Sequence, residues 1–330
     1  MDKDLEEDQL YSYKRLLYLA IGLSKRGLII DNKQEFNYFV GMYGYENVVL
    51  KYQNEFLVDP DNAESNFIKG TKFSDIRNLF LFDTDLRKEI FSIMQLFELR
   101  LENAMINIIE NVISDQYSDY TKSKYFKKSY FLKGEGGKEY KKIIRKKLLN
   151  HIDRYRNNTK RDLDINELIP RMYFGEVENW YFLLDDKLRE KVAYYITVGP
   201  LYEYKEFDKN NNPMSYIDPM IQLYKGYRNQ AAHEGVIYNY YDPKISWPYQ
   251  GAIFMGKKRF YNNHCCVGLL LLHSFLLTDK SLFHRFDDAI YNLVSKYIAK
   301  NPSQIDILSE MGLDQLANID DRFNKLINQY

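Results

Sequence analysis

The chain has 330 residues with 46 Lys and Arg against 46 Asp and Glu, so its formal net charge is zero. This balance excludes a uniformly basic nucleic-acid coat and an acidic disordered chain. A composition that is 45% hydrophobic and 16% aromatic, with only 8 Pro and 16 Gly, predicts a folded globular protein. The length fits one large domain or two closely packed units.

The cysteines and the apolar stretches indicate the compartment. Cys265 and Cys266 are adjacent, which does not suit a structural disulfide and favours a reducing environment. The longest apolar stretch, residues 267–277, is interrupted by His273 and is too short to span a bilayer. The N-terminus is acidic, unlike the start of a signal peptide. We therefore expect a soluble, cytoplasmic protein that has no membrane partner.

The spacing of apolar residues predicts an all-α fold class. A first helix is expected over 5–24, a second helical stretch after Asn32, and a loop over 58–71. Apolar residues then recur every three or four positions over 73–113, with Asp83 as the place where this helix could break. This is the longest predicted helix, and we interpret it as the spine of a helical bundle.

Further helices are expected towards the C-terminus. Gly175 should divide the helical pattern at 163–196, and another helix should run from Asp218, with Pro219 in its first position, to near Gly235. Residues 236–260 are expected to be irregular, and helices should return at 263–278, 281–299 and 303–328. The predicted organisation is an N-terminal helical region at 1–70, a helical core at 71–300 with a basic insertion at 122–161, and a packed C-terminal helix at 301–330.

Residues 122–161 carry a strong local excess of positive charge. They contain 15 Lys and Arg and only three acidic residues, an excess of 12 that the rest of the chain balances. A GEGG turn at 134–137 separates an aromatic basic stretch from residues 138–156, which read as helical. Aromatic side chains among cations suit base stacking and phosphate neutralisation, so we predict RNA binding. The predicted RNA-binding residues are Lys124, Tyr125, Lys127, Lys128, Lys141, Lys142, Arg145, Lys146, Lys147, Arg154 and Arg156.

Several familiar enzyme motifs are missing. The chain has no Gly-rich phosphate loop, no HExxH, no paired CxxC and no GxSxG. His264, His273 and the two cysteines adjoin a strongly apolar stretch and have no second ligand pair at standard spacing. We read them as buried small residues and hydrogen-bonded imidazoles, and we predict no metal and no cofactor.

The segment YRNQAAH at 227–233 has an R-x4-H pattern. On a helix, Asn229 and His233 share a face, while Arg228 points to the flank. RNA strand cleavage needs a proton-transfer group with a pKa near neutrality and a permanent cation on the phosphate, which these residue types supply. One histidine does not easily fill both proton-transfer roles, so a composite site from two copies of the chain is expected.

A structural interpretation of the same residues stays open. The motif could be a capped helix end in which Arg228 pairs with an acidic neighbour and His233 is a polar surface residue. A second match, Arg259 to His264, straddles a predicted boundary between loop and helix, and we regard it as a coincidence.

Blocks at 73–109, 167–184 and 227–239 together resemble the Abi-like proteins of bacterial abortive phage infection, the AbiD/AbiF group. The shared features are FD-x-x-LR (Phe82, Asp83, Leu86, Arg87), ELR at 98–100, an aromatic-FG turn at Phe174 and Gly175, and RN-x3-H. Residues 38–56 also resemble the N-terminal part of that family, so the likeness covers roughly residues 10–245. The order of these blocks is more specific than any one of them.

The resemblance implies a HEPN-type helical bundle that dimerises and uses R-x4-H as a metal-independent ribonuclease motif. By resemblance, Arg228 and His233 are catalytic and Asn229 supports them, while Glu98, Arg100 and Glu102 face the site or form a salt-bridged interior. A toxin-like role in phage defence is implied, restrained by a partner such as a small noncoding RNA. A non-catalytic RNA-binding scaffold and a helical protein-interaction module remain as alternatives.

Overall fold

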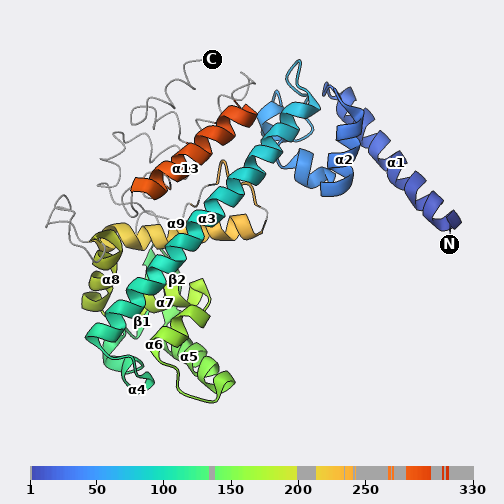
Figure 1. The fold of residues 1–330 in the computed structure, drawn as a ribbon. Coiled ribbons are helices and arrows are strands. Elements are labelled where there is room, and N and C mark those ends of the chain that lie inside the picture. Colours follow the sequence, from blue (N-terminus) through green and yellow to red (C-terminus); the bar gives the residue numbers. More distant parts are fainter. Residues whose placement is uncertain are drawn as a thin grey trace. The chain divides into compact units, whose positions relative to one another are not determined.

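The computed structural model describes residues 2–133, 138–198, 213–233, 235–240 and 280–298, together with single positions 242, 267, 268, 270, 307, 310 and 311. Most of these residues are helical, which confirms the predicted fold class, and the described strands form one small antiparallel sheet (Figure 1). Among these residues, no helix combines the length and the apolar character needed to cross a bilayer.

The chain divides into two compact units. Unit 1 consists of Met1–Lys88 and Asp288–Tyr330, and unit 2 consists of Glu89–Asp287. We describe each unit separately.

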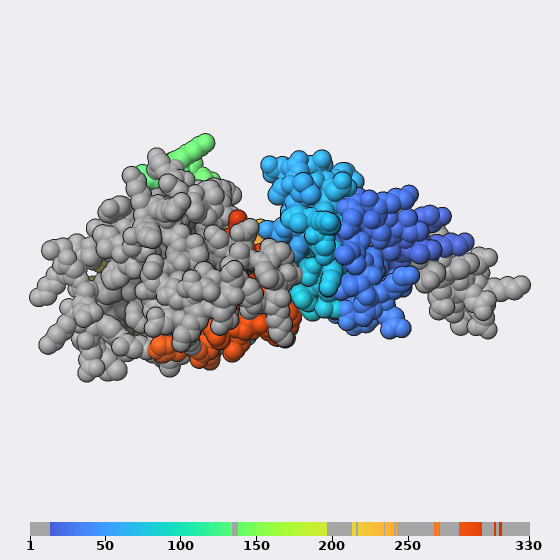
Figure 2. Space-filling view, turned by 90° about the horizontal axis from the view of Figure 1, so that it is seen from above, coloured from blue at the N-terminus to red at the C-terminus, as the bar shows by residue number. Residues whose placement is uncertain are grey.

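Unit 1 opens with the predicted helices. They are α1 (Asp2–Lys25) and α2 (Lys33–Tyr43), followed by the π-helical turn η1 (Glu46–Leu50) and the 3-10 turn η2 (Gln53–Phe56). The side chain of Asn32 begins α2 because it accepts hydrogen bonds from the amides of the first turn. The predicted loop follows η2, and Arg26 fastens it by donating to the carbonyls of Ala63 and Ser65. In Figure 2 these segments pack beside the first turns of α3.

The long helix α3 (Phe73–Val112) is continuous, so the break considered at Asp83 is wrong. The Asp83 side chain is fully buried, yet it accepts hydrogen bonds from Tyr52 Oη at 2.9 Å and from Arg87 Nη2 at 3.2 Å. A buried carboxylate is tolerated in a helix when it is paired in this way.

The helix predicted over 281–299 is confirmed as α13 (Lys280–Leu293), continued by the π-helical turn η6 (Val294–Ile298). Within unit 1, Tyr297 of η6 donates a hydrogen bond to Asp85 of α3 at 2.7 Å. Most of residues 236–260 and most of the helices predicted at 263–278 and 303–328 lie outside the described residues.

Unit 2 contains the end of α3, a hairpin and a set of shorter helices. These elements are α4 (Tyr117–Tyr120), η3 (Ser123–Tyr125), β1 (Ser129–Lys133), β2 (Glu139–Ile144), α5 (Arg145–Thr159), α6 (Ile165–Leu168), η5 (Ile169–Arg171), α7 (Phe174–Leu183), α8 (Asp186–Val198) and α9 (Met214–Ala232). The hairpin and α9 both contact α7, and Tyr130 and Tyr140 of the hairpin hydrogen-bond to side chains of α9. Figure 1 shows these elements in one part of the fold. The core of the unit is α7, whose residues Val177, Trp180 and Tyr181 are fully buried.

The hairpin corrects the prediction that residues 138–156 are entirely helical. Residues 139–144 pair with β1 instead, with Tyr130 opposite Ile143 and Leu132 opposite Lys141. Leu132 and Ile143 are buried on the face that both strands share, so period-two burial prevails here over the helical propensity of the lysines. The helix begins only at Arg145.

Two helix boundaries also differ from the prediction. Gly175 lies in the first turn of α7, because the chain breaks earlier, where the amide of Tyr173 donates to the Glu176 carboxylate at 3.1 Å in a capping box. Helix α9 begins at Met214 rather than Asp218, so Pro219 lies inside it. It ends at Ala232, with His233 as its C-cap.

Candidate functional site at the end of α9

The R-x4-H pattern lies on the last turns of α9, which aromatic contacts anchor within unit 2. Tyr224 stacks on Phe97 of α3 with ring centroids 4.1 Å apart and an interplanar angle of 19°. Tyr227 is fully buried and meets the edge of Tyr240 at 5.0 Å. Because these rings fix the rotation of α9, the directions of the polar residues between them are set as well.

Arg228 faces α3. Its Nε lies 3.4 Å from Oε1 of Glu98, and the Arg228 side chain remains 39% exposed. Burial raises the pKa of Glu98 even though the guanidinium opposes that rise. One turn further along α3, burial and the charge of Glu98 raise the pKa of Glu102 to about 7. The α3 side of α9 is therefore a place where negative charge is already disfavoured.

Asn229 and His233 face the other way, into a cavity of about 330 Å³. We call this cavity the motif pocket. It lies between the end of α9, the hairpin and α7, and Arg228 is not among its lining residues. The lining residues are Leu132, Tyr140, Lys141, Glu178, Gln222, Lys225, Gly226, Asn229, Gln230, His233, Tyr240 and Asp242.

The motif pocket brings two lysines, Lys141 and Lys225, together with two carboxylates, Glu178 and Asp242. Glu178 is 1% exposed and forms ion pairs with Lys225 and with Lys141, whose Nζ lies 3.7 Å away. Lys141 also donates to the side chain of Asn179 at 3.2 Å. Burial lowers the pKa of Lys141, Glu178 opposes that change, and Lys225 adds to it. The second carboxylate of the pocket, Asp242, lies 3.5 Å from Tyr240 Oη, so the charges of the two lysines and the two carboxylates balance.

The geometry separates the three predicted catalytic residues into two groups. Asn229 and His233 line one pocket, as their four-residue spacing predicts, whereas Arg228 lies on the flank. His233 is exposed at the helix end, and its backbone amide donates a hydrogen bond to Asn229 O at 3.0 Å. The ion pair of Arg228 and the capped helix end, which the structural interpretation expects, are thus both present. The catalytic roles of the three residues stay predictions.

The protein's own carboxylates neutralise part of the positive charge of residues 122–161, the basic segment. Six of its 15 cations form ion pairs with carboxylates, and three of these pairs lie at or beyond the end of α5. The pairs are Lys122 with Asp119, Lys127 with Asp186, Lys141 with Glu178, Arg154 with Glu176, Arg156 with Asp162, and Arg161 with Glu167.

The other nine cations have no carboxylate partner within the described part of the chain. They are Lys124, Lys128, Lys133, Lys138, Lys142, Arg145, Lys146, Lys147 and Lys160. Two of them lie over aromatic rings, with Lys124 Nζ 4.6 Å from the Tyr125 centroid and Lys142 Nζ 5.0 Å from that of Phe131. Most of the predicted RNA-binding residues therefore keep an unneutralised charge, and RNA binding by this segment stays a prediction.

Sequence reasoning missed two contributors to the motif pocket. Lys225 lies one turn before Asn229 and two turns before His233, so helical spacing alone could have placed it on the same face. Glu178 carries no comparable signal, because its role depends on α7 packing against α9. In the regions that the structure describes, no cluster of three metal-ligating side chains occurs, and His264, Cys265, Cys266 and His273 lie outside those regions.

Unit 2 thus places a basic hairpin beside the R-x4-H end of α9. The sequence profile of the Abi-like protein family matches residues 35–239, more than half of the chain. The chain therefore belongs to the Abi-like family, whose members are associated with abortive infection, a form of phage defence. Searches found no matching curated protein and no matching solved structure.

Proposed function

We propose that this protein is a HEPN-type, metal-independent endoribonuclease that acts as a toxin in abortive infection. In this proposal RNA lies on the basic hairpin and the first turn of α5, and His233 transfers protons at the strand that is cut. The observation that carries the proposal is the motif pocket. It joins Asn229 and His233 to the basic hairpin through Lys141, with Lys225 beside them.

The roles follow from chemistry and position. The exposed imidazole of His233 can accept the 2′-OH proton or protonate the leaving 5′-oxygen. Lys141 and Lys225 are the cations that can contact a phosphate in the motif pocket, in exchange for their contacts with Glu178. Asn229 offers an amide one turn from His233, which suits it to hold the RNA or the imidazole in place.

The position of Arg228 supports a site built from two copies. Five residues apart on a helix, Arg228 and His233 are separated by about 140° and face different flanks. A guanidinium that is 39% exposed can still contact the phosphate of an RNA strand held partly by a second copy. We therefore propose a homodimer in which Arg228 from one copy and His233 from the other act on one scissile phosphate.

The test is cleavage of a labelled single-stranded RNA by the full-length protein and by His233→Ala. We expect cleavage to fall by about 10²- to 10⁴-fold, the usual contribution of general acid–base catalysis, while RNA binding is retained. Growth arrest on expression should be lost with it. His284→Ala removes another exposed histidine, on α13, and is the matched control that should cleave normally. Undiminished cleavage by His233→Ala would refute the proposal.

Addition of a chelator provides a second test. Cleavage should persist in the presence of excess chelator, because the proposed proton transfers use side chains of the chain itself. Loss of cleavage on chelation, with recovery on adding one divalent metal, would contradict this part of the proposal.

A non-catalytic RNA-binding scaffold is the second candidate. The separation of Arg228 from His233 within one chain favours it, because the two residues do not meet in the motif pocket. It predicts tight, salt-dependent RNA binding with no cleavage by the wild-type protein, and equal binding by Arg228→Ala.

A further inference from the structure

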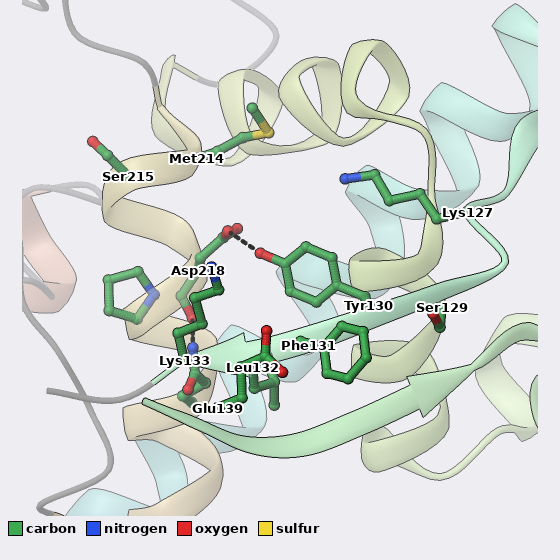
Figure 3. A pocket seen from close by; sticks show the side chains of 12 residues that line it. Lys127, Ser129, Tyr130, Phe131, Leu132, Lys133, Glu139, Met214, Ser215 and Asp218 are labelled. Atoms are coloured by element: carbon green, nitrogen blue, oxygen red, sulfur yellow. Dashed lines mark hydrogen bonds between the residues drawn. The ribbon is translucent and has the colours of Figure 1, made fainter. Parts of the chain in front are cut away.

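A second cavity adjoins the motif pocket along α9. It encloses about 690 Å³ between β1 and the first half of α9 (Figure 3). We call it the hairpin-edge pocket. Its lining residues are Lys127, Ser129, Tyr130, Phe131, Leu132, Lys133, Glu139, Met214, Ser215, Asp218, Pro219 and Gln222.

The two cavities follow one face of α9. Leu132 and Gln222 line both of them, so the pockets meet at these side chains. The lining residues of α9 recur every three or four positions from Met214 to His233, a stripe about 29 Å long at 1.5 Å per residue. A strand that reaches His233 from this direction therefore passes the hairpin-edge pocket first.

The wall of the hairpin-edge pocket on the β1 side is rigid. The Tyr130 ring stacks on Phe182 with centroids 5.3 Å apart, and the Arg189 guanidinium lies 4.7 Å from the Tyr130 ring centroid. Tyr130 Oη is 3.4 Å from Asp218, which also accepts a hydrogen bond from Tyr181 at 2.8 Å (Figure 3). Arg189, 7% exposed, lies 3.7 Å from the same carboxylate. A preformed wall lowers the entropy cost of ordering a ligand.

The other surfaces of the pocket offer groups that recognise a nucleotide. The amide of Arg145 donates to Lys128 O at 3.2 Å, so these two residues form a hydrogen-bonded pair of the hairpin. Because such pairs alternate along antiparallel strands, the N–H and C=O groups of Ser129 and Phe131 point away from β2, along the pocket. Within the described residues, these edge groups have no backbone partner. The Phe131 ring is 37% exposed, and Lys133 is an exposed cation beside it.

We propose that the hairpin-edge pocket receives one unpaired nucleotide of the RNA strand that continues into the motif pocket. The base packs against the Phe131 ring and hydrogen-bonds to the β1 edge, while Lys133 contacts its phosphate. The continuity with the motif pocket favours a nucleotide within a strand over a free one. A paired base does not fit, because its hydrogen-bonding edge is occupied and its strand is held in a duplex. This inference rests on the proposed function and adds a subsite that selects unpaired RNA.

The test uses full-length protein in the His233→Ala background, so that bound RNA stays intact. Ser215→Trp fills the pocket from α9, and Phe131→Ala removes the exposed ring. Each should weaken binding of a short single-stranded RNA by about 5- to 100-fold, the range for loss of one base contact. The matched controls are Ser92→Trp on an exposed position of α3 and Tyr18→Ala on α1, which should bind as the parent does.

Abasic substitutions along the RNA identify the bound nucleotide. An abasic substitution at one position of the RNA should weaken its binding to the parent His233→Ala protein by about 5- to 100-fold. The same substitution should not weaken binding to Ser215→Trp further, because the contact with that base is already lost. That position should also keep a constant separation from the cut made by the wild-type protein. Equal abasic penalties in the parent and in Ser215→Trp would overturn the inference.

The outcomes separate this inference from the proposed function. If the wild type cleaves RNA and its binding depends on the basic hairpin, but the two pocket variants bind normally, only the subsite is wrong. If a nucleoside monophosphate alone occupies the pocket while RNA binding ignores both variants, the pocket serves a free nucleotide and the inference is overturned. If the wild type binds no RNA, both proposals fail.

Discussion

On the hairpin side of α9, Lys141 and Lys225 share the buried carboxylate of Glu178, whereas on the α3 side Glu98 and Glu102 lie one turn apart and Arg228 pairs with Glu98. One helix thus separates a pocket in which two lysines meet two carboxylates from a place where carboxylates are already disfavoured. A phosphate can approach the two lysines of the first place, whereas in the second it must compete with Glu98 for Arg228. His233 shares its pocket with the two lysines, and Arg228 does not.

The largest expected loss of stability follows from removing both lysines of the motif pocket. Lys141→Ala with Lys225→Ala leaves Glu178, 1% exposed, without its two cations, and we expect a loss of about 3–5 kcal/mol in the free energy of unfolding. Each single variant should cost much less, because one lysine remains. Urea unfolding measures the difference. Adding Glu178→Gln should recover most of the loss, and no recovery would show that the charge is not the cause.

Removing the cation on the α3 side should have a smaller effect. Arg228→Ala leaves Glu98, at 23% exposure, beside Glu102 without its ion-pair partner, so we expect a loss of about 1–2 kcal/mol at neutral pH. The double variant with Glu98→Gln should be close to wild type in thermal unfolding. If Arg228→Ala is as stable as the wild type, the pair contributes nothing.

The smallest expected effect is a pH dependence from Glu102. Its folded-state pKa is raised to about 7, so the stability that this carboxyl contributes at low pH is lost as pH rises from its ordinary 4.5 through 7. Glu102→Gln cannot ionise, so at about pH 8 its free energy of unfolding should exceed that of the wild type by roughly 1 kcal/mol, given the partial exposure of this side chain. Thermal unfolding should show this as a higher unfolding temperature. Near pH 4.5 the two proteins should unfold together. Identical curves at both pH values would contradict the raised pKa.

The sequence predicted the parts of the fold that depend on local periodicity. The helical spacing at 73–113 identified α3, and the four-residue spacing of Asn229 and His233 predicted their shared face. It failed where tertiary contacts prevail. Asp83 stays helical because Tyr52 and Arg87 pair with it, and residues 139–144 become a strand because they pair with β1. The pairing of Arg228 with Glu98, 130 positions earlier in the chain, leaves no local pattern at all.

The basic segment shows the same limit. Its charge count is visible in the sequence, but the division between neutralised and available cations is not. The arginines of and just after α5 pair with Glu176, Asp162 and Glu167, two of which lie in later elements. The cations of the hairpin and of the first turn of α5 have no such partners in the described regions.

This division supplies the most direct test of RNA binding on the hairpin side. Two triple variants remove the same number of positive charges from one segment: Lys142, Lys146 and Lys147 to Ala, and Arg154, Arg156 and Arg161 to Ala. The measurement is the affinity for single-stranded RNA over a range of salt concentrations. The first variant should lose about 50-fold in affinity at 0.15 M salt and flatten the logarithmic salt slope by about 2, from three lost phosphate contacts.

The second variant should bind RNA with the wild-type slope and should instead be slightly less stable than the wild type in urea unfolding, because its arginines are held in exposed ion pairs. Equal losses of affinity and equal slopes in the two variants would contradict a specific RNA surface on the hairpin and would leave only the net charge of the segment as the cause.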